Sequence, residues 1–181
     1  MATVTQIRNI TALAVCGLCA FASATMAASA MKAPPDVTLL EGDGIRIAFD
    51  SAENGFNCIG IENRVVPEPT AFCGPEPEGA ALWKLTFWCD GSPTNTLTID
   101  NLAPCERAMA REDGALLFAW RGIALGDEPD AVDVRATISL TPDGSAAEWR
   151  LAVTNRSKRW GLAETTYPIL RNVVKPGRPT C

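Results

Sequence analysis

The residues best suited to acid–base chemistry in this sequence are the carboxylates of the segment GDEPDAVD. A glycosidase needs two such groups at a set separation, one as the acid and one as the nucleophile or base. The segment contains Gly and Pro between two extended runs, so we expect a solvated loop, and its spacing does not match a helix–loop–helix calcium site. The carboxylates concerned are Asp127, Glu128, Asp130 and Asp133. We expect no catalytic residue, no metal site and no cofactor in this chain.

Histidine is absent from all 181 residues. A Ser–His nucleophile pair is therefore excluded, and the chain has no G-x-S-x-G turn of the kind that presents a nucleophilic serine. Structural zinc is also disfavoured, because no two cysteines have C-x-x-C spacing and no histidine is there to complete a mixed site.

The first thirty residues have the layout of a bacterial signal peptide. A short segment carrying Arg8 precedes the apolar run ITALAVCGLCAFASA, and small residues at Ala28 and Ala30 suit signal peptidase. We expect cleavage after Ala30, with Ala24 as the alternative, and neither lipidation nor a stable membrane anchor. The prediction is a leader at 1–30, a linker at 31–36, a β-sandwich domain at 37–175 and a tail at 176–181, in a secreted or periplasmic protein.

Five cysteines remain after the expected leader: Cys58, Cys73, Cys89, Cys105 and Cys181. In an oxidising compartment two disulfides and one unpaired thiol are expected, with the pairing left open. Burial of several of them as small hydrophobic side chains is the alternative. The net charge of −5 argues against nucleic acid as a partner.

Short extended runs with turn residues between them follow from Val37 onwards. The run AVDVRATISL alternates most regularly, with Val132, Val134, Ala136, Ile138 and Leu140 on one side. The turn TPDG then leads into AAEWRLAVTN, which predicts an antiparallel hairpin between 132–140 and 148–154. The segment APCERAMARED is also expected to be extended or irregular, because Pro104 and its shortness disfavour a helix. About nine such strands predict an all-β fold, an antiparallel β-sandwich.

The five tryptophans fall into two groups according to whether their neighbours along the chain are apolar or polar. Trp83, Trp120 and Trp149 align with apolar neighbours and are expected in the core. Trp88 shares a strand face with Lys84, and Trp160 follows two basic residues in a turn. Trp88 and Trp160 are therefore the candidates for carbohydrate binding or for an interface with a neighbouring domain.

The order of these segments resembles the N-terminal, galactose-mutarotase-like supersandwich region of secreted glycoside-hydrolase-like proteins. The resemblance rests on LWKLTFW, LLFAWRGI and VDVRATISLTPDGSAAEWRLAVTNRSKRWGLAETTYPIL and covers roughly residues 36–175. It implies a supersandwich fold with no catalysis by this region itself. It also implies two partners: carbohydrate, and a C-terminal catalytic barrel that these residues do not contain. Epimerase activity is not carried over, because that chemistry depends on histidines. Since a full supersandwich is longer, we expect an incomplete sandwich that leaves part of the face of Trp149, Leu151, Val153 and Ile169 uncovered.

Two functions follow as hypotheses. The first is a non-catalytic N-terminal β-sandwich segment of a secreted carbohydrate-active enzyme. The second is a free-standing carbohydrate-binding or envelope adhesion module.

Asn155 stands at the end of the extended run AAEWRLAVTN, where the chain must turn. Its side chain is expected to satisfy backbone groups of that turn.

Overall fold

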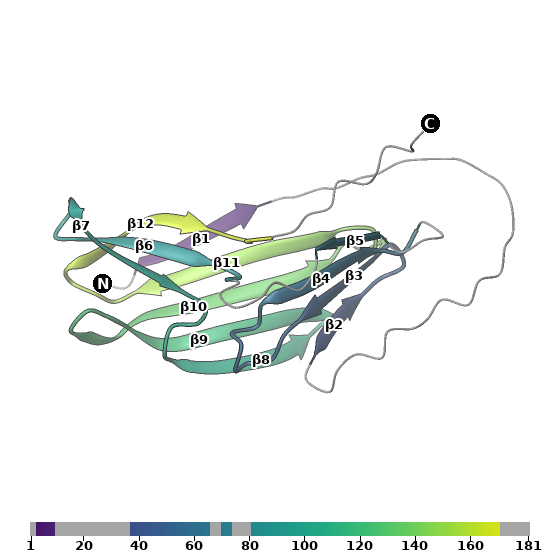
Figure 1. Cartoon of the computed structure of the whole chain (residues 1–181), viewed down its shortest axis with the longest axis horizontal. Helices are drawn as coiled ribbons and strands as arrows, with labels where there is room; N and C mark the ends of the chain where they lie inside the picture. Colours follow the sequence, from purple (N-terminus) through teal and green to yellow (C-terminus); the bar gives the residue numbers. More distant parts are fainter. Residues whose placement is uncertain (1–2, 10–36, 66–69, 74–80, 171–181) are drawn as a thin grey trace, which may run out of the picture.

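The computed structural model describes residues 3–9, 37–65, 70–73 and 81–170, and every regular element within them is a β-strand (Figure 1). The strands are β1 (Thr3–Asn9), β2 (Thr38–Glu41), β3 (Ile45–Phe49), β4 (Cys58–Asn63), β5 (Thr70–Cys73), β6 (Lys84–Cys89), β7 (Ser92–Asp100), β8 (Glu106–Glu112), β9 (Ala115–Leu125), β10 (Glu128–Leu140), β11 (Ala147–Asn155) and β12 (Trp160–Thr166). The predicted all-β class is confirmed, and the segment containing Pro104 leads into a strand, β8, as expected.

The strands form three antiparallel sheets arranged in two layers. One layer is a five-stranded sheet in the order β1-β11-β10-β9-β8. The other layer consists of a three-stranded sheet, β12-β6-β7, and a four-stranded sheet, β2-β3-β4-β5. Figure 1 shows these two smaller sheets along the length of the large one. The apolar sides of all three sheets contribute to one continuous core.

The hairpin of β10 and β11 has the register that the alternating sequence predicts. Val132 lies opposite Asn155, and Leu140 lies opposite Ala147. In the turn, the N–H of Thr141 donates to the carbonyl of Ala146 at 2.9 Å. Gly144 adopts a φ of +65°, in the left-handed region that glycine enters without a steric penalty. The predicted antiparallel hairpin is confirmed.

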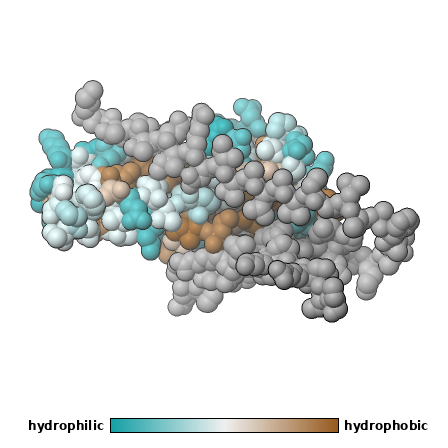
Figure 2. All heavy atoms as spheres, turned by 90° about the horizontal axis from the view of Figure 1, so that it is seen from above, coloured by the Kyte–Doolittle hydropathy of each residue, from teal (hydrophilic) through white to brown (hydrophobic). Residues whose placement is uncertain are grey.

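Aromatic side chains fill the space between the layers. Trp83 and Trp120 meet edge to face with ring centroids 5.4 Å apart, and Phe49 of β3 contacts both Phe118, at 5.0 Å, and Trp149, at 5.7 Å. The three tryptophans assigned to the core from the sequence are buried there. Seen from above, hydrophobic residues gather between hydrophilic ends of the described surface (Figure 2).

The expectation of an uncovered inward face on β11 is wrong. Trp149, Leu151 and Val153 are only 4%, 0% and 1% exposed. Phe49 from the four-stranded sheet and Tyr167, which follows β12, both pack against the Trp149 ring. Ile169 is half-buried. The expectation rested on the greater length of a full supersandwich. Length alone does not reveal that the two smaller sheets together cover this end of the large sheet.

A buried asparagine ties three loops together inside the core. Asn101 is 0% exposed, and its amide donates to the carbonyl of Gly55 at 2.8 Å and to Oδ1 of Asn57 at 2.7 Å. Its own Oδ1 accepts the N–H of Leu82 at 2.7 Å. Its backbone carbonyl accepts the indole N–H of Trp120 at 3.1 Å. A buried polar side chain with all these partners satisfied fixes one arrangement of the surrounding chain.

The expected leader is described only in part. Thr3–Asn9 forms β1 and pairs along β11, from Thr3 opposite Asn155 to Asn9 opposite Trp149. The expected cleavage site at Ala30 and the linker at 31–36 lie outside the described residues, as does the expected tail at 176–181. Among the residues described, no helix is long and apolar enough to cross a membrane.

The cysteines differ from the expected pattern. Cys89, which is buried, and Cys105, which is half-buried, carry free thiols. Three of the five cysteines then remain, too few for two disulfides, so that expectation is wrong for this structure. The side chains of Cys73 and Cys181 lie outside the described residues. Packing of β6 explains the state of Cys89, because its alternate residues Leu85, Phe87 and Cys89 all enter the core.

Candidate functional site

Trp88 lies on the outer face of the three-stranded sheet. Along β6 the side chains of Lys84, Thr86 and Trp88 alternate with buried Leu85 and Phe87, so the first three point away from the core. The Trp88 side chain is 40% exposed. The sequence prediction that this tryptophan faces outward is in agreement with its position.

Polar groups surround Trp88 on this face. Trp88 lies opposite Gly161 of β12 on one side and Thr96 of β7 on the other. Two residues before Trp88 in β6, Thr86 lies opposite Thr98 of β7, and their hydroxyl oxygens are 3.3 Å apart. We call this surface the Trp88 face; it comprises Lys84, Thr86, Trp88, Thr96, Thr98, Gly161 and Glu164.

Open space lies over Gly161, the residue opposite Trp88 in β12. A Cβ placed on Gly161 would meet no heavy atom within 4 Å. The flat side of an aromatic ring next to unfilled space, with hydroxyl, ammonium and carboxylate groups around it, can stack against one apolar side of a ligand and hydrogen-bond to its polar edge.

Trp160 does not join Trp88. It lies opposite Cys89 in the register, one position from the Trp88–Gly161 pair, so it occupies the other side of the sheet. Its ring approaches Gly126, where an added Cβ would lie 3.5 Å from Cζ2 and 3.6 Å from Nε1. The indole nitrogen is buried and donates no hydrogen bond to any of the described residues. The two candidate tryptophans thus occupy different environments, one outward and one inward.

The turn before Trp160 explains this orientation. The side-chain amide of Asn155 donates to the carbonyl of Trp160 at 2.6 Å, and its Oδ1 accepts the N–H of Ser157 at 3.0 Å. The expected role of Asn155, which is to satisfy turn backbone groups with its side chain, is confirmed.

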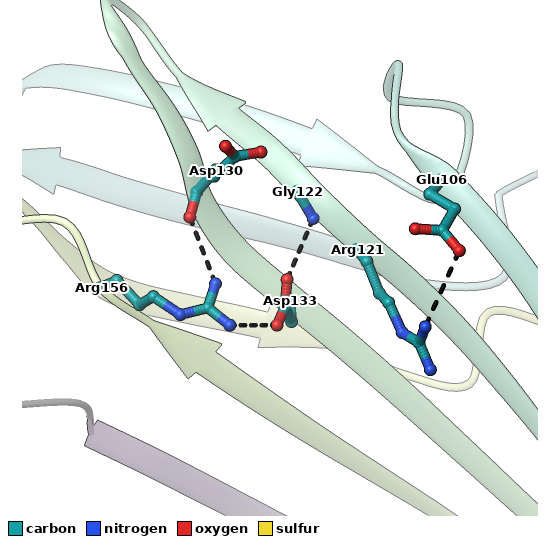
Figure 3. A pocket seen from close by; sticks show the side chains of 6 residues that line it. All are labelled: Glu106, Arg121, Gly122, Asp130, Asp133 and Arg156. Atoms are coloured by element: carbon teal, nitrogen blue, oxygen red, sulfur yellow. Dashed lines mark hydrogen bonds and ion pairs between the residues drawn. The ribbon is translucent and has the colours of Figure 1, made fainter.

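A second polar surface lies on the outer face of the five-stranded sheet. Here a shallow, open hollow of about 480 Å³ is lined by Glu106, Arg121, Gly122, Asp130, Asp133 and Arg156 (Figure 3). We call it the charged hollow. Its residues come from β8, β9, β10 and the turn after β11.

The charged hollow is built over a bulge between β9 and β10. Val134 pairs with Trp120 and Val132 pairs with Ile123, so Arg121 and Gly122 together face the single residue Asp133. Gly122 has a φ of +71°, and its N–H donates to the Asp133 carboxylate at 3.0 Å. Asp133 therefore takes the place of the backbone acceptor that the bulge removes.

Arg156 completes the Asp133 environment. Its guanidinium donates to the Asp133 carboxylate and, at 3.2 Å, to the backbone carbonyl of Asp130. This hydrogen bond lowers the pKa of Asp133, against an opposing effect of partial burial, and the same contact raises the pKa of Arg156. A carboxylate held ionised by a guanidinium is a weak proton donor, so this pair is suited to structure rather than to acid catalysis.

Two groups of the charged hollow are less engaged. Arg121 approaches Glu106 only at 3.7 Å, and these side chains are 52% and 69% exposed. The Asp130 carboxylate accepts no hydrogen bond from the described residues. It lies over Gly122, where a Cβ would come within 2.7 Å of Oδ1.

The solvated loop expected for the acidic segment is largely wrong. Leu125 pairs with Glu128, which leaves a two-residue turn of Gly126 and Asp127, and Gly126 adopts a φ of +61°. Glu128, Asp130 and Asp133 are therefore within β10. The sequence signal that was missed is Gly122, whose conformational freedom permits the bulge that brings Asp133 against β9. No group of three or more metal-ligating side chains occurs in the described part of the chain.

Comparison of the chain with protein-family models, with curated proteins and with solved structures found no match.

Proposed function

We propose that this chain is a non-catalytic β-sandwich region of a secreted carbohydrate-active enzyme and that it contacts sugar through the Trp88 face. The observation that carries the proposal is the exposed Trp88 indole with open space above Gly161. A pyranose ring has one side formed by C–H groups, and this side stacks on a flat aromatic ring with loss of apolar area to water.

The polar surroundings of Trp88 favour a sugar over a neighbouring domain. An interface between domains usually has a hydrophobic centre of several large apolar side chains. On the Trp88 face the residues opposite Trp88 are Gly161 and Thr96, and Thr86, Thr98, Glu164 and Lys84 lie farther along the same face. Hydroxyls both donate and accept hydrogen bonds, as do the hydroxyls of a glycan.

The assignment to a non-catalytic region is supported by the state of the carboxylates. Asp133, a half-buried carboxylate of the acidic segment, is held by Arg156 and by the Gly122 N–H. The resemblance noted in the sequence supplies the remainder of the proposal: a catalytic barrel elsewhere in the same protein, and a secreted or periplasmic location.

A free-standing carbohydrate-binding or envelope adhesion module is the second candidate. The observation that favours it is the continuous core, in which the inward side chains of β11 are covered by Phe49 and Tyr167. Both candidates share the Trp88 face and differ in whether the region acts with a catalytic domain.

The proposal is tested with the purified full chain, titrated with a panel of soluble polysaccharides by affinity electrophoresis and calorimetry. Trp88→Ala should weaken binding at least about tenfold, which corresponds to roughly 1.4 kcal/mol. Met109→Ala is the matched control, because Met109 is a similarly exposed apolar side chain, at 45%, on β8 of the other layer. Equal affinities for wild type and Trp88→Ala, or no polysaccharide binding at all, would overturn the proposal.

Catalysis is tested separately on aryl glycosides and on the mutarotation of α-glucose. We expect no turnover by the purified chain. Turnover that is abolished by a single Asp or Glu substitution would contradict the non-catalytic assignment.

A further inference from the structure

The charged hollow has hydrogen-bonding capacity of both signs left unused. The Arg121 guanidinium has five N–H donors, and its one described ion pair, with Glu106, is a loose one at 3.7 Å. The Asp130 carboxylate has about four acceptor sites and receives no hydrogen bond from the described residues. Donors and acceptors therefore border the same open volume of about 480 Å³ (Figure 3).

The backbone of Asp130 is held in an unusual conformation. Asp130 has a φ of +51°, in the left-handed region, within the irregular part of β10 between Glu128 and Val132. Arg156 fixes this conformation by donating to the Asp130 carbonyl at 3.2 Å, and its backbone N–H donates to the carbonyl of Ala131 at 2.8 Å. A backbone that is fixed in advance reduces the entropy that Asp130 loses when a ligand binds.

The lining excludes several ligand classes. Three carboxylates face two guanidiniums, a net charge of −1 that disfavours phosphates, sulfates and uronic acids. The lining has no aromatic or aliphatic side chain on which a lipid tail or an aromatic ring would pack. A metal ion is disfavoured because no three ligating side chains converge in the described residues. What remains is a neutral ligand that both donates and accepts hydrogen bonds.

We propose that the charged hollow binds hydroxyls of a neutral glycan, with the Asp130 carboxylate accepting from one part of the glycan and the Arg121 guanidinium donating to oxygens of another part. Asp133 and Arg156 act as positioning residues, because they hold the Gly122 bulge and the Asp130 backbone. The ligand class rests on the proposed function, whereas the site itself is separate from the Trp88 face.

The two sites lie on opposite outer faces of the sandwich, since each is on the side of its sheet that points away from the shared core. One chain therefore binds two glycan segments at once.

The test uses the Trp88→Ala chain, in which the charged hollow is the remaining site, titrated with a neutral oligosaccharide taken from the polysaccharide that the wild type binds. Asp130→Asn removes the charge and keeps a residue that tolerates positive φ. Arg121→Gln removes the guanidinium. Each should weaken the residual binding roughly tenfold, as expected for the loss of a charged hydrogen bond.

Arg150→Gln is the control, because Arg150 also lies on the outer face of the large sheet but pairs with Glu148 outside the hollow. Its affinity should equal that of the Trp88→Ala parent. An oligosaccharide of the same size that contains uronic acid should bind more weakly than the neutral one. Tighter binding of the acidic sugar would overturn the ligand class.

The outcomes separate this proposal from the function proposed above. If residual binding is unchanged by Asp130→Asn and Arg121→Gln, or if Trp88→Ala alone removes all binding, the charged hollow is not a site and the Trp88 face stands. If these two substitutions abolish wild-type binding while Trp88→Ala has no effect, the charged hollow stands and the Trp88 face falls. Absence of binding by the wild type would overturn both.

Discussion

The two outer faces of this sandwich present different kinds of side chain to solvent. The Trp88 face places a large aromatic ring among hydroxyls, where its apolar surface remains in contact with water. The outer face of the five-stranded sheet has charged side chains, and at the β9–β10 bulge it joins Asp133 to Arg156. The first arrangement leaves apolar area available to a ligand, whereas the second pairs Asp133 with Arg156 and leaves Asp130 and Arg121 less engaged. If both proposals hold, we expect the Trp88 face to bind sugar more tightly than the charged hollow.

The largest expected effect is the difference in stability loss between replacing a buried tryptophan and replacing the exposed one. Trp120→Ala should reduce the free energy of unfolding by about 3–5 kcal/mol, because it empties a fully buried site that packs against Trp83. Trp88→Ala should change it by no more than about 0.5 kcal/mol, as surface substitutions usually do. Chemical denaturation of both variants measures the contrast, and similar losses for the two would show that Trp88 is a core residue.

The buried asparagine should come next in size. Asn101→Ala leaves the Leu82 N–H and the Gly55 carbonyl without their partner in the core. We expect a loss of at least about 2 kcal/mol in unfolding free energy, since each buried unpaired group costs about 1–3 kcal/mol. Asn95→Ala, at an exposed position of β7, is the control and should be close to neutral. A neutral Asn101→Ala would mean that water enters the core and replaces the side chain.

Filling the space beside Trp88 should affect binding and spare the fold. Gly161→Val places a side chain where Gly161 has no neighbour within 4 Å, and its backbone needs no positive φ. Stability should be unchanged or rise by about 0.5–1 kcal/mol, because glycine weakens a strand. Polysaccharide affinity should fall roughly tenfold, by steric exclusion of the ring that stacks on Trp88.

A substitution that also introduces valine, on the outer face of the five-stranded sheet, provides the control for Gly161→Val. Ala110→Val enlarges an exposed side chain of β8, on the outer face of the large sheet. Its affinity should match the wild type. If Gly161→Val binds normally, the open space above Gly161 is not where the ligand lies.

The smallest effect concerns the β10–β11 turn. Hydrogen bonds from the Thr141 and Ser145 hydroxyls and from the Ser145 N–H lower the pKa of Asp143 to about 2. A lowered pKa in the folded state means that the stabilisation is complete above the ordinary aspartate pKa and disappears as the pH falls toward 2. The difference in Tm between wild type and Asp143→Ala should therefore shrink between pH 5 and pH 2. A difference that stays constant over this range would contradict the assignment.

The sequence predicted those parts of the fold that depend on regular alternation. The hairpin of β10 and β11 and the burial of Trp83, Trp120 and Trp149 follow from the period-two pattern and from hydrophobicity. The outward position of Trp88 followed from the same pattern, because Lys84 and Thr86 share its side of β6.

The features that the sequence did not predict depend on single residues in unusual conformations or on long-range contacts. Gly122 gives no local sign that it forms a bulge, and without the bulge Asp133 has no reason to lie against β9. Asn101 looks like an ordinary turn residue, and its burial depends on loops far away in the sequence. Trp160 was expected to be exposed because it follows basic residues, but the register of β12 with β6 turns it inward.

Nuclear magnetic resonance of the tryptophan indoles shows whether a sugar contacts Trp88. The chain has five tryptophans, and four of them are buried or half-buried, so their indole N–H signals serve as internal controls for the exposed one. The Trp88 signal is assigned by its loss in Trp88→Phe, and the purified full chain is then titrated with a neutral oligosaccharide. We expect the Trp88 indole signal to shift progressively and to saturate while the other four stay in place. Binding that leaves the Trp88 signal unmoved would contradict a sugar site on the Trp88 face.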